Sequence, residues 1–122
     1  MALERLLDYL SDRADLEIYG WTEQAQTGGI EPEVTRFVFE FFNTRGIPSG
    51  KLRLDDRLQT DLHLNEALPQ EWGDEFQDDF VDRFGVSRLF TPGPAPNTVR
   101  DLLIFVQQEL DRWRAENKDD HR

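Results

Sequence analysis

Apolar residues recur at helical spacing in four stretches of this 122-residue chain. Spacings of three and four residues predict helices over about residues 2–13, 32–45, 69–84 and 98–114. Pro32 and Pro69 fit first helical turns, where a missing N–H costs no hydrogen bond, and Gly46 fits the position after a last turn. The residues that set these periods are Leu3, Leu6, Leu7 and Leu10; Val34, Phe37, Val38, Phe41 and Phe42; Trp72, Phe76, Phe80 and Phe84; and Val99, Leu102, Leu103, Val106, Leu110 and Trp113.

The segments between these helices differ in character. Residues 14–30 fit either a brief strand or a packed loop, and the pattern does not decide between them. Residues 47–63 predict a loop anchored inward by four leucines, namely Leu52, Leu54, Leu58 and Leu62. Residues 91–96 contain three prolines and predict an extended connector. Thr98 and Asp101 have the spacing of a capping box at the start of the last helix.

Strongly amphipathic helices joined by short connections predict a small all-α bundle. We expect residues 1–30 to form an amino-terminal helix and an irregular segment packed on the core, residues 31–114 to form the bundle, and residues 115–122 to be a frayed polar tail. A chain of this length can bury a core of its own, so no cofactor is needed for folding.

Composition and charge narrow the classes of partner. The chain has no cysteine, which excludes disulfides and thiolate chemistry, and it has no apolar run of the ~20 residues that span a bilayer. Its first residues lack the apolar stretch of a signal peptide, so we expect a cytoplasmic protein. The net charge of −11 repels phosphate backbones and anionic lipids, which argues against nucleic-acid or membrane binding and favours a basic protein surface as partner.

The negative charge is concentrated in one part of the chain. Residues 55–82 contain ten carboxylates and one arginine. Helical spacing places five of these carboxylates on one face of the predicted 69–84 helix, namely Glu71, Asp74, Glu75, Asp78 and Asp82. Because neighbouring like charges destabilise a helix, we interpret this face as a site that binds a basic partner. The alternative is a solvated face that only keeps the protein soluble.

Several of these features together resemble acyl carrier proteins. They are the helix ending at Gly46, the segment from Leu58 to Leu62, the acidic helix ending at Phe84, and the helix that begins after Thr98. The resemblance covers about residues 31–112. More closely, the chain resembles a group of uncharacterised small bacterial proteins that share this fold. The resemblance implies an acyl-carrier-like four-helix bundle, here with an extra amino-terminal helical segment, whose acidic second helix docks onto basic patches of partner enzymes.

The chain departs from the carrier pattern at the residue that holds the prosthetic group. In carrier proteins a serine at the start of the second helix carries 4′-phosphopantetheine through an ester. Counting forward from Asp61 places Glu66 at that position, and counting back from Phe84 places Gln70 there. Neither a carboxylate nor an amide can form the ester. We therefore expect no prosthetic group and no carrier activity.

Other candidate chemistry is weaker. Asp61, His63 and Glu66 lie close together in sequence but form an incomplete cation site, so capping or solvent-exposed roles are favoured over metal binding. No catalytic motif is present, and we expect no enzyme activity. The leading interpretation is a non-catalytic protein-binding module. The alternative is an immunity or antitoxin protein that neutralises a basic, nuclease-type toxin, for which electrostatic steering would give fast capture.

Overall fold

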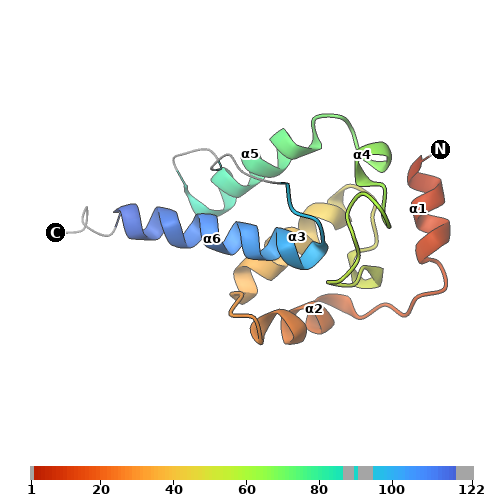
Figure 1. The fold of residues 1–122 in the computed structure, drawn as a ribbon, viewed down its shortest axis with the longest axis horizontal. Helices are drawn as coiled ribbons and strands as arrows, with labels where there is room; N and C mark the ends of the chain where they lie inside the picture. The colour runs from red at the N-terminus through yellow and green to blue at the C-terminus, as the bar shows by residue number, and fades with distance from the viewer. Residues whose placement is uncertain (1, 87–89, 91–94, 118–122) are drawn as a thin grey trace.

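The computed structural model describes residues 2–86, 90 and 95–117 and is built from helices (Figure 1). Its helices are α1 (Ala2–Leu10), α2 (Glu17–Gln26), α3 (Pro32–Thr44), the 3-10 helix η1 (Ser49–Lys51), α4 (Leu64–Ala67), α5 (Trp72–Phe84) and α6 (Val99–Asn117). The described residues form no strand, and their only ladder contact is an isolated antiparallel bridge between Arg57 and Thr98. The prediction of an all-α fold is confirmed for this part of the chain.

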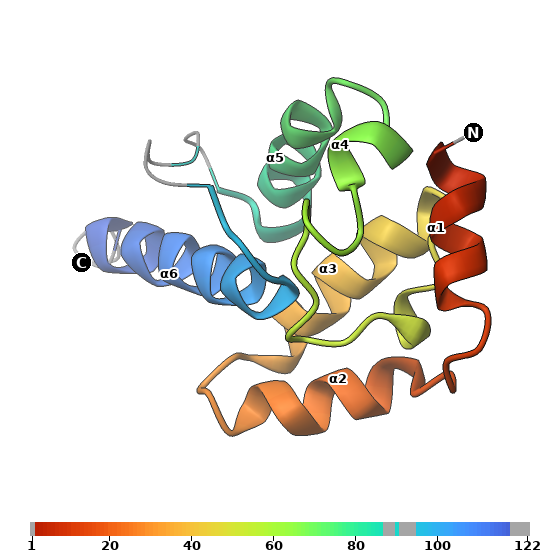
Figure 2. The same cartoon turned by 45° about the vertical axis from the view of Figure 1, so that its right-hand side comes forward.

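Helix α3 lies at the centre of the fold. Helices α2, α5 and α6 pack against it, and α1 packs against α4 at the end of the molecule away from the last turns of α6 (Figures 1 and 2). The predicted inner residues of α3 are buried, with Val34, Val38 and Phe42 fully enclosed. Each buried side chain of this size contributes about 2 kcal/mol through removal of apolar surface from water.

Aromatic rings fill the space between α3 and α5. Phe76 and Phe80 of α5 are buried, and the Phe37 ring of α3 lies 5.1 Å from Phe76 and 6.1 Å from Phe80, measured between ring centroids. The Phe41 ring meets Phe76 edge to face at 4.8 Å. Edge-to-face pairs add stabilisation beyond area burial, so this ring cluster fixes which side of α5 faces the core.

The loop between α3 and α4 is anchored as the sequence predicts. Its four leucines, Leu52, Leu54, Leu58 and Leu62, are all buried. In α1, Leu6 and Leu10 are buried, whereas Leu7 is 37 % exposed. The prediction that Leu7 belongs to the inner stripe is therefore wrong, because α1 packs through one narrow side against the α4 region.

Two helices differ from the sequence prediction by being present at all, and a third starts later than predicted. Residues 17–26 of the undecided amino-terminal segment form α2, which buries Trp21 against α3 and η1. Helix α4 lies in a stretch for which no helix was predicted. Helix α5 starts at Trp72, because Glu71 has φ −90° and ψ 19° and residues 69–71 form a turn in which Trp72 N–H donates to the Pro69 carbonyl.

The start of α6 confirms the predicted capping box. The Thr98 hydroxyl accepts a hydrogen bond from the Asp101 N–H at 3.0 Å, and the Asp101 carboxylate accepts one from the Thr98 N–H at 3.3 Å. Most of the predicted proline-rich connector, and residues 118–122 of the predicted tail, lie outside the described residues. Within the described helices, none is both long and apolar enough to cross a membrane.

Candidate functional site

Helix α5 presents its charged side to solvent because its opposite side is fixed by the ring cluster. Phe76 and Phe80 are buried against α3, so residues half a turn away must point outward. The helix ends at Gly85, which adopts the left-handed conformation with φ 66° that glycine accepts without steric cost. We call the five predicted carboxylates, Glu71, Asp74, Glu75, Asp78 and Asp82, the α5 acidic face.

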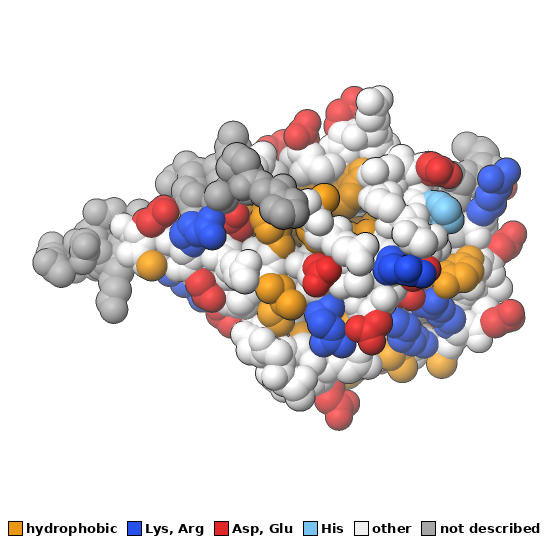
Figure 3. Space-filling model, in the orientation of Figure 1, with side chains coloured by type: hydrophobic (Ala, Val, Ile, Leu, Met, Phe, Trp, Pro, Cys, Tyr) orange, Lys and Arg blue, Asp and Glu red, His pale blue; other side chains and the backbone are white. Residues whose placement is uncertain are grey.

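Four carboxylates of the α5 acidic face have no partner among the described residues. Glu71, Asp74, Asp78 and Asp82 are exposed, and none of them forms an ion pair or side-chain hydrogen bond within the part of the chain that is described. Acidic side chains accordingly line the upper edge of the molecule, over α5 (Figure 3). No described cation neutralises these four charges.

Glu75 differs from the other four. Its carboxylate accepts two hydrogen bonds from the Arg45 guanidinium, at 3.3 and 3.0 Å, and its side chain is 42 % exposed. Arg45 follows the last turn of α3, also lies 3.5 Å from the Asp79 carboxylate, and stacks on the Phe41 ring at 3.7 Å from the ring centroid. The hypothesis that all five carboxylates are available to a partner therefore needs a correction, since Glu75 already pairs with α3.

A second ion pair joins α3 and α5 closer to the end of α5. Arg83 donates a hydrogen bond to Glu40 at 3.0 Å. A shallow groove of about 320 Å³ opens between the two helices beside this pair, and Asp79 and Asp82 form part of its wall. The groove between α3 and α5 thus lies beside the α5 acidic face, and a partner bound to that face can also contact α3.

A separate pocket of about 420 Å³ lies between α1 and the segment that leads into α4. We call it the α1 pocket. Helix α1 supplies three lining residues and residues 60–66 supply the rest; together they are Arg5, Leu6, Tyr9, Thr60, Asp61, Leu62, His63 and Glu66. The segment turns sharply at His63, which has φ 51° and ψ 46°, and the Leu64 N–H closes the turn by donating to the Leu58 carbonyl. This turn directs residues 60–66 toward α1.

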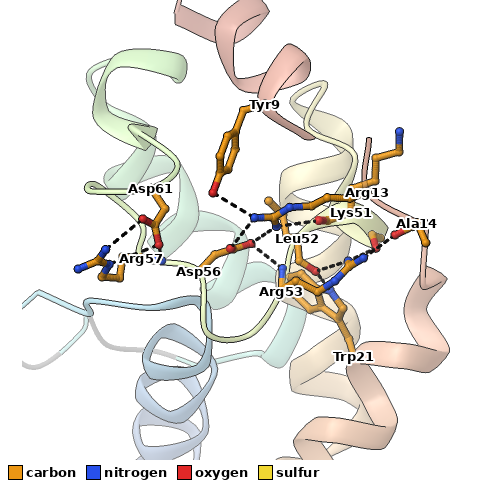
Figure 4. Close-up of polar contacts among 11 residues, drawn as sticks. Tyr9, Arg13, Ala14, Trp21, Lys51, Leu52, Arg53, Asp56, Arg57 and Asp61 are labelled. Atoms are coloured by element: carbon orange, nitrogen blue, oxygen red, sulfur yellow. Dashed lines mark hydrogen bonds and ion pairs between the residues drawn. The ribbon is translucent and has the colours of Figure 1, made fainter. Parts of the chain in front are cut away.

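Asp61 is held by its own segment and carries a compensated charge. Its carboxylate accepts a hydrogen bond from the Arg57 N–H at 2.9 Å and two from the Arg57 guanidinium, at 3.4 and 3.3 Å (Figure 4). These bonds, led by the one from the backbone N–H, lower the pKa of Asp61 below its usual value because they favour the ionised form. Asp61 and Arg57 therefore contribute no net charge to the pocket.

A partly buried ion pair fixes the chain just after α1, beside this pocket. Arg13 donates to both carboxylate oxygens of Asp56, at 2.6 and 3.0 Å, and to the Tyr9 hydroxyl oxygen at 3.2 Å (Figure 4). Asp56 is 7 % exposed and also accepts a hydrogen bond from the Arg53 N–H at 2.7 Å. The hydrogen bonding of the Arg13 guanidinium to the Asp56 carboxylate, which accepts, is the main cause of a raised pKa for Arg13. These contacts hold α1 against the loop after α3, and so they also hold the α1 side of the pocket in place.

The residues considered for a prosthetic group or a cation separate in space. Glu66 is exposed on α4 and lines the α1 pocket, whereas Gln70 lies in the turn before α5 and does not line it. Asp61, His63 and Glu66 all line the pocket, but no group of three metal-ligating side chains is found within the described ranges. Of the two positions that could correspond to the serine of carrier proteins, Glu66 therefore lines an open pocket and Gln70 does not.

Sequence reasoning missed the contributions of α1 to this pocket. Arg5 and Tyr9 lie four residues apart on α1, a spacing that places them on one face of the helix, but only the packing of α1 on α4 brings that face to residues 60–66. Thr60, which lies in the predicted loop of residues 47–63, also lines the pocket.

Comparison of the chain with protein-family models, with curated proteins and with solved structures found no match.

Proposed function

We propose that the protein is a non-catalytic docking module that binds a basic surface of a partner protein through the free carboxylates of the α5 acidic face. The observation that carries this proposal is the contrast between this face and the remaining charged surface. Seven arginines pair with the chain's own carboxylates in the described part, namely Arg13, Arg45, Arg57, Arg83, Arg100, Arg112 and Arg114. Glu71, Asp74, Asp78 and Asp82 have no cationic partner among the residues that the structure describes.

Unpaired like charges on one helix side lower stability. Carboxylates three or four residues apart, such as Asp74 and Asp78, repel one another by about 0.2–0.5 kcal/mol per pair. A partner that supplies lysine or arginine side chains would remove this repulsion on binding and would be attracted from a distance, which mainly raises the association rate. Repulsion that the chain does not neutralise itself is thus consistent with selection for binding.

The fold that we propose for this module is an acyl-carrier-like four-helix bundle with α1 and α2 added at its amino-terminal side. The order of α3, an anchored loop, α5 and α6 supports this proposal, as does the turn at Asp61. Since Glu66 and Gln70 cannot form the prosthetic-group ester, the module works without that group, and we place it in the cytoplasm. Intact-mass measurement after incubation with a phosphopantetheinyl transferase and coenzyme A is expected to show no adduct, whereas a mass gain would contradict the proposal.

The docking proposal is tested by affinity capture from the native host with three forms of the protein as bait. The first is the wild type. The second is the triple variant Asp74→Asn, Asp78→Asn, Asp82→Asn, which removes three charges from the α5 acidic face. We expect quantitative mass spectrometry to find at least one basic protein that the wild type retains and this variant loses.

The third bait is a matched control that loses the same number of charges elsewhere. It carries Asp8→Asn, Asp12→Asn and Glu23→Gln, all exposed and placed on α1, α2 or between them. We expect the control to retain the basic partner. Equal loss in both variants would mean that only net charge matters and would contradict docking through α5. If the retained protein is a nuclease whose activity the wild type inhibits, the module acts as an immunity protein.

A further inference from the structure

Two side chains of opposite charge that line the α1 pocket have no partner in the described part of the chain. Arg5 from α1 and Glu66 from α4 both line it, and the side chain of neither forms an ion pair or hydrogen bond with the residues that the structure describes. They do not pair with each other either. This arrangement is unusual for Arg5, because most other arginines in the described part pair with a carboxylate.

We propose that the α1 pocket binds a small zwitterion of the α-amino-acid class. The carboxylate of the ligand binds the Arg5 guanidinium, its ammonium group binds the Glu66 carboxylate, and its side chain packs on Leu6 and Leu62. Both leucines line the pocket from its two sides, one from α1 and one from the turn before α4. The site is separate from the α5 acidic face and does not depend on the docking function.

Charge balance favours a zwitterion over a simple anion or cation. Since Arg57 already compensates Asp61, Arg5 and Glu66 are the uncompensated charges of opposite sign in the pocket. An anion bound to Arg5 would be repelled by Glu66, and a cation bound to Glu66 would be repelled by Arg5. A ligand that carries both charges a short distance apart satisfies both residues at once.

Size and hydrogen bonding agree with this ligand class. A pocket of about 420 Å³ falls in the range of small-molecule sites, with apolar and polar groups on its wall. The Tyr9 oxygen accepts a hydrogen bond from Arg13, which leaves the Tyr9 O–H free to donate. The Thr60 hydroxyl also lines the pocket and has no side-chain hydrogen bond to another described residue. The hydroxyls of Tyr9 and Thr60 can donate hydrogen bonds to the carboxylate of the ligand, in addition to those from Arg5.

The test is a two-dimensional NMR titration of the full-length ¹⁵N-labelled protein with leucine, valine, methionine and phenylalanine, each added separately. We expect at least one of them to bind with a Kd in the millimolar range and to shift the amide signals of residues 5–9 and 60–66. If leucine binds, 4-methylpentanoate, which lacks the ammonium group, and 3-methylbutylamine, which lacks the carboxylate, should each bind at least about tenfold more weakly.

Two variants assign the charges. Arg5→Gln should weaken binding of the amino acid about tenfold or more, but it should not change the weak binding of 3-methylbutylamine, which has no carboxylate. Glu66→Gln should also weaken binding of the amino acid about tenfold or more, but it should not change the weak binding of 4-methylpentanoate, which has no ammonium group. Arg36→Gln, which alters an exposed arginine of α3 with no ion pair in the described part, is the matched control and should bind as the wild type does.

The proposal is overturned if none of the four amino acids shifts the signals of residues 5–9 and 60–66. It is also overturned if the two truncated analogues bind as tightly as the amino acid, or if Arg5→Gln and Glu66→Gln leave the affinity at the value of the control. Because both residues are exposed, the variants should fold, and their spectra outside the pocket should match the wild type.

Discussion

Replacement of Arg13 by glutamine should destabilise the protein by about 2 kcal/mol. A buried charge that loses its partner costs about 3–5 kcal/mol when both groups are fully buried. Here the Asp56 side chain is 8 % exposed but the Arg13 side chain is 22 % exposed, so water can partly replace the guanidinium. Asp56 also keeps the hydrogen bond from the Arg53 N–H. Both circumstances reduce the cost to about 2 kcal/mol.

The assay is equilibrium unfolding in urea, analysed by linear extrapolation of the free energy of unfolding. A double-mutant cycle of Arg13→Gln with Asp56→Asn isolates the pair, and we expect a coupling energy of about 1–2 kcal/mol. The control Arg36→Gln changes an exposed arginine with no ion pair in the described part and should stay within about 0.5 kcal/mol of the wild type.

The reasoning is refuted if Arg13→Gln is as stable as the control, or if the effects of Arg13→Gln and Asp56→Asn simply add. Either result would mean that Asp56 does not depend on Arg13. The end of α1 would then not be held against the loop after α3 as the contacts in Figure 4 indicate.

Three further predictions concern stability and are checked by the same unfolding assay. The pKa of Glu31 is lowered, chiefly by its hydrogen bond from Arg114, so Glu31→Gln should destabilise the protein at neutral pH. The difference should begin to shrink as the pH falls below the usual glutamate value of 4.5 and should be lost as the pH passes the lowered pKa of the folded protein; a difference that stays constant with pH would contradict the role of the ion pair. Gly73→Ala should stabilise α5 by about 0.5 kcal/mol, because alanine favours a helix interior and its Cβ meets no neighbour there. Gly85→Ala should destabilise the protein by about 1 kcal/mol, because φ at this position is 66°. A change in the free energy of unfolding of the same sign for both variants would be contrary to expectation. Thr98→Ala should cost about 1 kcal/mol through loss of the cap of α6, and an unchanged stability would show the cap to be dispensable.

The sequence predicted the elements whose signals are local. Helices α3 and α5 carry regular apolar periods with a proline before or at the first turn, and the structure places Phe37, Phe76 and Phe80 on the inner sides that these periods indicate. The capping box of Thr98 and Asp101 is also contained within four residues, and it forms as expected. Such signals can be interpreted without knowledge of tertiary contacts.

Helix α2 could not be predicted because contacts distant in sequence define it. The helix begins at Glu17, which has φ 55° and whose N–H is capped by the Asp15 carboxylate at 2.8 Å. Its burial depends on Trp21, whose indole N–H donates to the Leu52 carbonyl 31 residues away at 3.2 Å. The contact between Trp21 and Leu52 reaches outside residues 14–30, so a residue pattern over that segment does not contain it. Tertiary packing therefore selected the helix over the strand or loop that the pattern allowed.

The same limit applies to the candidate sites. Spacing alone placed Glu75 on the α5 acidic face, but its pairing with Arg45 joins residues 30 positions apart and became evident only in the fold. The α1 pocket depends on the packing of α1 against α4, so Arg5 and Glu66 could not be connected from the sequence.

The most direct test of the docking function is the salt dependence of the Kd for the basic partner identified by capture, measured for the wild type and for the Asp74→Asn, Asp78→Asn, Asp82→Asn variant. Binding through free surface carboxylates is screened over about 8 Å at physiological ionic strength, so added salt should weaken wild-type binding steeply. The variant should bind more weakly at low salt and respond less to added salt. An affinity that does not change with salt, or that is equal in the two proteins, would contradict the account.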